Sequence, residues 1–166
     1  MRRTGTTNRA WAAILAALLV FAQLAFVPGG APGALAEMRK DPLKIVTTSG
    51  EHVFEVEVTE TPEQKARGLM FRRSLADNAG MLFPYLPPQE ATMWMRNTYI
   101  SLDMVFIKAD GRVHRIEHGT EPFSETVIAS RGDVAAVLEL KAGVAARIGL
   151  SPGDRVIHSL FSAATR

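Results

Sequence analysis

Apolar and polar positions follow two different patterns along the chain, and the change falls near residue 36. From Ala10 to Val27 the residues are apolar, with Gln23 as the one interruption. Prolines and glycines follow at 28–33 and would end a helix there. After residue 37 the pattern changes to short apolar segments separated by turn residues, which is typical of β-strands.

The first 36 residues predict a cleaved signal peptide. Three arginines and no acidic residue precede the apolar run, and Ala34-Leu35-Ala36 supplies the small residues that a signal peptidase requires. Cleavage before Glu37 would place the protein in the periplasm or outside the cell. The alternative is a retained N-terminal membrane anchor, because an apolar helix over 10–27 would span roughly 27 Å.

Eight segments after the leader combine β-forming residues with turn residues at their ends. They are 44–48, 52–58, 80–83, 92–96, 102–107, 112–118, 134–140 and 155–160. Within the second segment Phe54, Val56 and Val58 share one face, and Glu55 and Glu57 share the other. These segments predict about eight short strands.

Two short helices are predicted between the strands. The first spans 61–71, where Thr61 is a favourable N-cap, Pro62 suits the first helical position and Gln64 completes a capping box. The second spans 141–148. Many short strands with few helices predict a mainly β (α+β) domain, a small antiparallel barrel-like fold in which closure protects the strand edges.

The predicted organisation is a signal peptide at 1–36, a flexible lead-in at 37–42, one barrel-like domain at 43–160 and a tail at 161–166. The core of this domain is expected to bury eight side chains. They are Phe54, Leu69, Met81, Phe83, Met93, Met95, Phe106 and Leu138. About 130 residues after the leader are enough for one modest core.

Charge and cysteine content narrow the function classes. The leader carries three of the 19 basic residues and none of the 17 acidic ones, so the remaining chain has a net charge of −1. This balance argues against a nucleic-acid partner, which would require a basic surface. The chain has no cysteine, so the domain is stabilised without disulfides and its core must suffice.

Two carboxylates lie in otherwise apolar strands. Asp103 alternates onto the face of Val105 and Ile107, and Glu139 onto the face of Val137. A buried carboxylate is costly unless it is paired or hydrogen-bonded. We therefore expect at least one of them to be buried and bonded to an arginine or to backbone amides. The candidate arginines are Arg67, Arg72 and Arg96.

Three interpretations of the two carboxylates are open at this point. Arginine–carboxylate pairs would fix the register of the barrel and have no further role. A polar cluster at the mouth of a cavity would bind a small ligand. Two suitably spaced carboxylates would support glycoside hydrolysis, as general acid and as nucleophile or base.

The segment Met93-Trp94-Met95-Arg96-Asn97 offers further chemistry. Thioethers bind Cu(I), although methionines more commonly fill irregular cores. Trp94 beside Arg96 and Asn97 would stack on a sugar or another planar ligand. Met70, Met81 and Met104, which lie outside this segment, would add further thioether ligands.

Other common sites are missing from the sequence. The four histidines lack the spacing of a zinc site. The sequence contains no nucleophile elbow and no phosphate-binding loop. We therefore expect no cofactor and no conventional metal site.

Five motifs, in this order, resemble the domain of unknown function family 192. They are Arg67–Arg72 (RGLMFR), Gly80–Phe83 (GMLF), Met93–Thr98 (MWMRNT), Leu102-Asp103 with Phe106, and Val137–Leu140 (VLEL) with Gly143. The family often has lysine where Arg96 stands, which keeps the charge and changes its geometry. The resemblance covers 43–160 and implies a small β-barrel-like fold that is often exported. It brings no established activity, cofactor or catalytic residue.

Taken together, these features predict a non-catalytic small-ligand-binding domain of the periplasm or cell surface. The predicted binding residues are Arg67, Trp94, Arg96, Asn97, Asp103 and Glu139. The alternatives are a glycosidase-like hydrolase using Asp103 and Glu139, a structural or protein-interaction module, and a Cu(I)-binding protein. The expected partner is a small molecule, with neither nucleic acid nor, after removal of the leader, a membrane.

Overall fold

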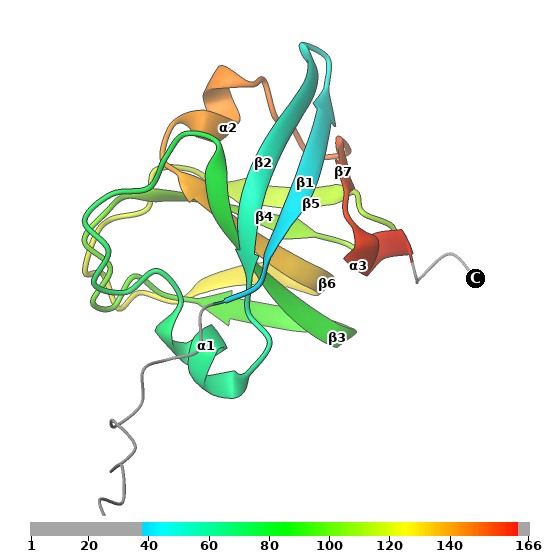
Figure 1. Cartoon of the computed structure of the whole chain (residues 1–166). Helices are drawn as coiled ribbons and strands as arrows, with labels where there is room; N and C mark the ends of the chain where they lie inside the picture. The colour runs from blue at the N-terminus through cyan, green and yellow to red at the C-terminus, as the bar shows by residue number, and fades with distance from the viewer. Residues whose placement is uncertain (1–37, 163–166) are drawn as a thin grey trace, which may run out of the picture. The chain divides into compact units, whose positions relative to one another are not determined.

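Seven strands form one curled sheet in the computed structural model, which describes residues 38–162 (Figure 1). The strands are β1 (Lys40–Thr47), β2 (Gly50–Val58), β3 (Ala79–Met93), β4 (Leu102–Ile107), β5 (Val113–Glu117), β6 (Ile128–Lys141) and β7 (Arg155–Ile157). Their order in the sheet is β5-β4-β6-β3-β2-β1-β7. The short helices are α1 (Pro62–Arg67), α2 (Val144–Arg147) and α3 (Ser159–Ser162). The predicted signal peptide lies outside the described residues.

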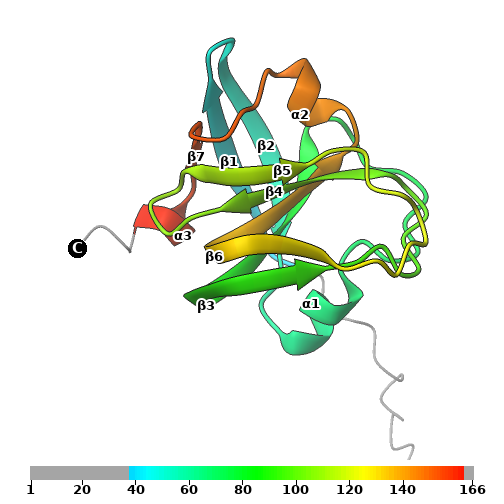
Figure 2. The ribbon, with the colours of Figure 1, turned by 180° about the vertical axis from the view of Figure 1, so that it is seen from behind.

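The two edges of the sheet meet and make the fold barrel-like (Figure 2). Arg112, next to β5, forms an antiparallel bridge with Arg155 of β7, and Val156 N donates to Gly111 O at 2.8 Å. Gly111 has φ 79°, and a Cβ there would lie 2.6 Å from Val156 O, so this approach requires glycine. The predicted mainly β, barrel-like fold is confirmed.

Helix α1 makes one pair of neighbouring strands parallel, because it connects β2 to β3. The prediction of a wholly antiparallel sheet is wrong at this pair. The predicted capping box is formed, since Thr61 Oγ1 accepts from Gln64 N and Gln64 Oε1 accepts from Thr61 N, both at 3.2 Å. The helix ends at Arg67 and not near Phe71, because Gly68 takes a φ of 49° and turns the chain.

β3 is one long strand where the sequence predicts two. Three prolines separate the predicted segments 80–83 and 92–96, but they do not end the strand. The register against β6 shifts between Pro84 and Gln89, so the missing N–H groups fall where the ladder is interrupted. The described domain therefore has seven strands and not eight.

The ends of the domain also differ from the prediction. β1 begins at Lys40, inside the expected lead-in. The predicted strand 155–160 contains β7, and the chain then turns into α3, so three helices are present among residues 38–162 where two were predicted. β4 has the predicted bounds, Leu102–Ile107.

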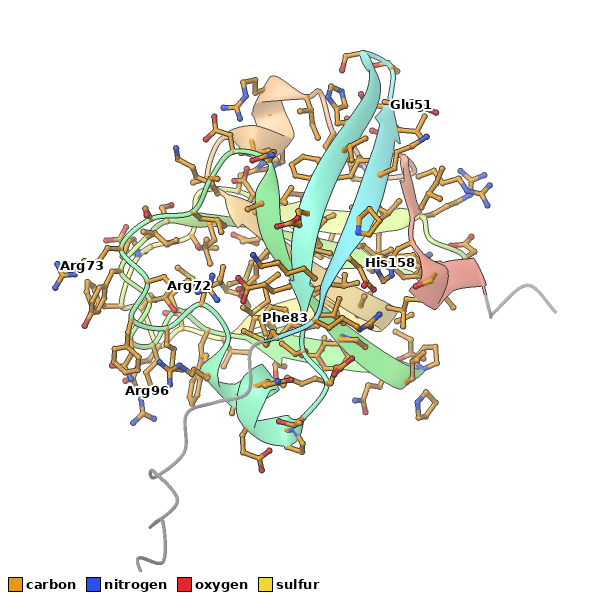
Figure 3. All side chains as sticks on the ribbon, in the orientation of Figure 1. Glu51, Arg72, Arg73, Phe83, Arg96 and His158 are labelled. Carbon is orange, nitrogen blue, oxygen red and sulfur yellow. The ribbon has the colours of Figure 1, made fainter. Side chains whose placement is uncertain are left out.

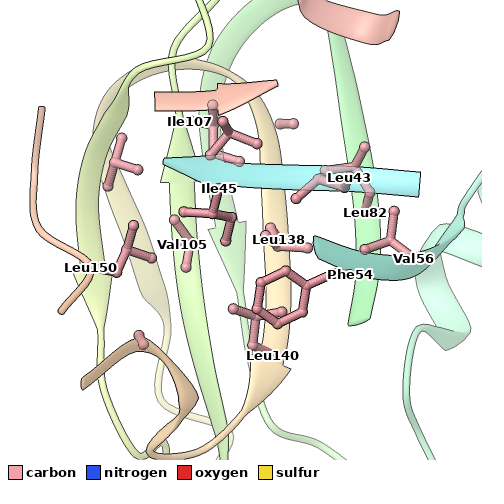
Figure 4. Packing of buried hydrophobic residues seen from close by; sticks show 14 of the residues in the cluster. Leu43, Ile45, Phe54, Val56, Leu82, Val105, Ile107, Leu138, Leu140 and Leu150 are labelled. Atoms are coloured by element: carbon pink, nitrogen blue, oxygen red, sulfur yellow. The ribbon is translucent and has the colours of Figure 1, made fainter. Parts of the chain in front are cut away.

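Two clusters of buried apolar side chains lie on the two faces of the sheet. The first unites side chains from all seven strands, among them Ile45, Phe54 and Leu138, and so fills the inside of the curl (Figure 4). The second lies on the other face of β3, β4 and β6, where Leu69 and Met95 from connecting segments cover it.

The predicted core residues are buried, with one exception. Met93 is only partly buried, because β3 ends there. The other seven are at most 4% exposed. Phe83 and Phe106 belong to the second cluster, on the outer face.

Candidate functional site

The six predicted binding residues do not form one pocket. Asp103 and Glu139 are buried in strands β4 and β6. The other four are exposed in connecting segments or at a helix end: Arg67, Trp94, Arg96 and Asn97.

The two buried carboxylates point to opposite faces of the sheet. The register of β4 and β6 pairs Asp103 with Leu140 and Glu139 with Met104. Paired residues share a face and successive residues alternate, so Asp103 and Glu139 lie on different faces. They cannot flank one glycosidic bond. The glycosidase-like arrangement predicted as an alternative is therefore wrong.

Asp103 connects three segments of the fold. Its carboxylate is fully buried and accepts from Gly119 N at 3.0 Å and from Ala145 N at 2.9 Å. The second bond caps the first turn of α2. His118 Nδ1 lies 3.9 Å from Asp103 Oδ1. This bonding confirms the prediction of a buried carboxylate held by backbone amides, and it gives Asp103 a structural role.

Glu139 has a different environment. It is 4% exposed and lies between Met81 of β3 and Met104 of β4. Within residues 38–162 its carboxyl group forms no hydrogen bond and no ion pair. Burial without a compensating charge raises the pKa of Glu139 to about 8, so the group is mainly protonated at neutral pH.

None of the candidate arginines binds either buried carboxylate. Arg72 makes two hydrogen bonds to Glu57 of β2 instead, one of them at 2.6 Å. Arg96 Nε lies 3.9 Å from Glu125 Oε1. Of the two kinds of partner that the prediction allowed, the candidate arginines are therefore not used, because Arg67 lies at the end of α1 and Arg72 and Arg96 lie in connecting segments.

Three of the four exposed predicted residues, Arg67, Trp94 and Arg96, belong to a larger surface feature at the loop end of the sheet. Four aromatic side chains there are 38% to 58% exposed: Phe71, Trp94, Tyr99 and Phe123. Three arginines lie among them: Arg67, Arg73 and Arg96. We call these seven residues the aromatic–arginine surface. Figure 3 shows Arg73 and Arg96 projecting from this end of the domain.

Three connecting segments are tied together beneath this surface by backbone hydrogen bonds. Phe71 N donates to Asn97 O at 2.9 Å, and Phe123 N donates to Thr98 O at 3.2 Å. Phe71, Asn97 and Phe123 have φ between 55° and 66°. Residues other than glycine rarely adopt this region of φ, and backbone strain of this kind concentrates at functional sites. The surrounding bonds hold the rings in place.

The rings contact one another, and the guanidinium groups lie near the rings. The Phe71 and Tyr99 ring centroids are 6.1 Å apart, and those of Tyr99 and Phe123 are 5.2 Å apart. The guanidinium carbons of Arg67, Arg73 and Arg96 lie 5.5–6.0 Å from the Phe71, Tyr99 and Trp94 centroids. Among the described residues, neither Arg67 nor Arg73 has a carboxylate partner.

A pocket of about 530 Å³ lies beside Trp94. Its lining is mostly apolar: Pro62, Lys65, Ala66, Tyr85, Thr92, Met93, Trp94 and Val127. Lys65 Nζ lies 4.3 Å from the Tyr85 ring centroid and also donates to Pro84 O. Burial lowers the pKa of Lys65, and the volume suits a small organic ligand.

The methionines divide into two groups. The sulfur atoms of Met70, Met93 and Met95 accept hydrogen bonds from Asn97, Tyr85 and Thr120. Met81 and Met104 are fully buried on either side of Glu139. The five methionines considered for Cu(I) therefore do not share one environment.

Several residues of this surface were not singled out from the sequence. Phe71, Arg73, Tyr99 and Phe123 lie in segments between strands, which are polar and rich in turn residues. An aromatic residue in such a segment is a usable signal, because it has no sheet face on which to be buried. The convergence of the three segments depends on long-range pairing and gives no local signal.

Comparison with known proteins places the chain in a family. Residues 44–158 match the domain of unknown function family DUF192, described as "Uncharacterized ACR". A Sinorhizobium meliloti 1021 structure described as a "putative transcription regulator" is 43% identical, with a TM-score of 0.72 over 75% of this chain and 97% of that one. A Novosphingobium aromaticivorans DSM 12444 protein of unknown function is also 43% identical, with a TM-score of 0.72 over 77% and 91%. No curated protein matches. The chain belongs to the DUF192 family.

Proposed function

We propose that this protein is a non-catalytic binding domain whose site is the aromatic–arginine surface together with the adjoining pocket. The observation that carries the proposal is the set of exposed rings held by backbone bonds across three segments. Exposed rings and guanidinium groups bind ligands well.

The proposed ligand is a small organic anion with a flat or apolar face, such as an acidic sugar or an aromatic carboxylate. The guanidinium groups of Arg67 and Arg73 have no carboxylate partner among residues 38–162 and are free to pair with an anion. The rings of Trp94 and Phe71 offer the stacking faces. The pocket of about 530 Å³ beside Trp94 limits the buried part of the ligand to a small molecule.

We further propose that the protein is exported and that the mature chain begins at Glu37. The basis is the arginine-led apolar run and the Ala34-Leu35-Ala36 site. Within residues 38–162 no helix is long and apolar enough to cross a membrane. Sequencing the N-terminus of protein recovered from the periplasmic fraction tests this. Full-length chain found in the membrane fraction alone would instead indicate an anchor.

A nucleic-acid partner is the competing proposal, because one structural neighbour is described as a "putative transcription regulator". Aromatic rings and arginines do bind single strands. However, the chain after residue 36 has a net charge of −1, and affinity for nucleic acid depends on neutralising phosphates. We propose that nucleic acid is not the ligand. Salt-dependent binding of a fluorescent oligonucleotide would contradict this.

A thermal-shift screen of neutral sugars, acidic sugars and aromatic carboxylates tests the binding proposal. A true ligand at about 100 times its dissociation constant should raise the melting temperature by roughly 5–10 °C. Arg67→Ala and Trp94→Ala should remove that shift. Their matched controls are Arg155→Ala and Val53→Ala, which change exposed residues elsewhere. A shift that survives both site variants would exclude this surface as the site.

A further inference from the structure

A row of alternating carboxyl and thioether side chains crosses five neighbouring strands on the face of the sheet that carries Glu139. The register pairs Glu57 with Met81, Met81 with Glu139, Glu139 with Met104, and Met104 with Glu117. Because paired residues point to the same face, these five side chains lie side by side across β2, β3, β6, β4 and β5. This row is not visible in the sequence.

The two outer carboxylates of the row are neutralised, whereas the central one is not. Arg72 binds Glu57 and Arg115 binds Glu117. Glu139 is more than nine-tenths buried and has no hydrogen bond or ion pair among the described residues. No fully buried side-chain oxygen within residues 38–162 lacks a hydrogen-bond partner, so the unpaired carboxyl oxygens of Glu139 keep a small solvent-accessible area.

The cross-strand neighbours of Glu139 are two methionines whose sulfur atoms also lack a hydrogen bond among the described residues. Met81 and Met104 are fully buried, and within residues 38–162 their sulfur atoms accept no hydrogen bond. Cross-strand neighbours lie about 4.5–5.5 Å apart at Cβ. The methionine side chain is unbranched and adaptable, so both sulfur atoms are able to approach the carboxyl group between them.

We propose that Met81, Glu139 and Met104 form a binding site for one Cu(I) ion. Thioethers are soft ligands that select Cu(I) over hard cations such as Mg²⁺ or Ca²⁺. Binding would release the proton of Glu139 to solvent. The resulting single carboxylate matches the single charge of Cu(I), so the ion and its ligands are neutral together in a buried environment. The proposal is independent of the binding role of the aromatic–arginine surface, which lies in the connecting segments.

Anaerobic titration of the purified protein with Cu(I), in competition with bicinchoninate, tests this site. We expect one Cu(I) per chain. Met81→Leu, Met104→Leu and Glu139→Gln should each weaken the affinity about tenfold or more, which corresponds to at least about 1.4 kcal/mol. The control is Met70→Leu, which removes a partly exposed methionine outside the pocket whose sulfur accepts from Asn97. Unchanged affinity in all three site variants would overturn the proposal.

A second measurement needs no substitution and therefore does not depend on whether the variants fold. In protein labelled with ¹³C at the methionine methyl groups, one equivalent of Cu(I) should shift the Met81 and Met104 signals most. Shifts at the partly exposed Met70 and Met93 alone would mean adventitious surface binding and would overturn the site. Absence of any shift would do the same.

Discussion

Asp103 and Glu139 lie on neighbouring strands and are both buried, yet their surroundings are opposite. Asp103 accepts hydrogen bonds from two backbone amides and stabilises the junction of β4, α2 and the segment after β5. Glu139 has no such donors among the described residues, and its pKa is raised to about 8. Burial alone therefore does not separate a structural carboxylate from a functional candidate. The number of hydrogen bonds that the carboxylate accepts separates the two cases.

The largest expected effect tests the packing of the face that holds Glu139. Phe106 is fully buried there, with the Arg115 guanidinium carbon 4.9 Å from its ring centroid. Phe106→Ala should lower the free energy of unfolding in urea by about 3–5 kcal/mol. A loss below about 1 kcal/mol would show that the face around Glu139 is loosely packed. Tight burial would then not explain the difference between Glu139 and Asp103.

Removing the carboxylate of Asp103 should be nearly as costly. Asp103→Ala leaves the amides of Gly119 and Ala145 without their acceptor, and urea unfolding should show a loss of about 3 kcal/mol. Asp103→Asn keeps one acceptor oxygen and should lose less. Asp133→Ala, at an exposed position of β6, is the control. Equal stability of all variants would refute the structural role.

Replacing Glu139 should raise the free energy of unfolding, whereas replacing Asp103 lowers it, and the size of the increase should depend on pH. Its folded pKa of about 8 lies above the ordinary glutamate value of 4.5. The metal-free folded protein therefore keeps a proton that the unfolded chain loses, and the free energy of unfolding should fall as pH rises from about 4.5 to 8. Glu139→Gln should remove this slope and be roughly 2–3 kcal/mol more stable than the parent at pH 7.

Urea titrations of both proteins at several pH values measure this difference. Glu90→Gln, which changes an exposed carboxylate of β3, should leave the slope unchanged. A parent protein without the slope would mean that Glu139 ionises without penalty. In that case the contrast with Asp103 would disappear.

The smallest effect compares a local cap with the remote cap that Asp103 provides. Thr61 caps α1 from the adjacent residue, at a position open to water. Thr61→Ala should cost about 1 kcal/mol in urea unfolding, less than Asp103→Ala. A larger loss than for Asp103→Ala would show that burial adds nothing to the strength of such a cap.

Much of the local structure followed from the sequence because its causes are local. The run of β-forming residues predicted the strand 102–107 with its observed bounds, and Thr61 and Gln64 predicted the capping box. The prolines of β3 misled the prediction, because they fall in a register shift that only the pairing with β6 creates. The sequence also identified Asp103 and Glu139 as the polar residues that burial would make unusual.

The sequence by itself determined the mainly β fold, most of the buried side chains and the candidate carboxylates, since period-two alternation and polarity act on neighbouring residues. The tertiary structure alone decided which face each carboxylate occupies, because one residue of register between β4 and β6 exchanges the two faces. It also decided that Phe71, Tyr99 and Phe123 meet on one surface. These contacts join segments far apart in the chain, and long-range pairing is not encoded in any local pattern.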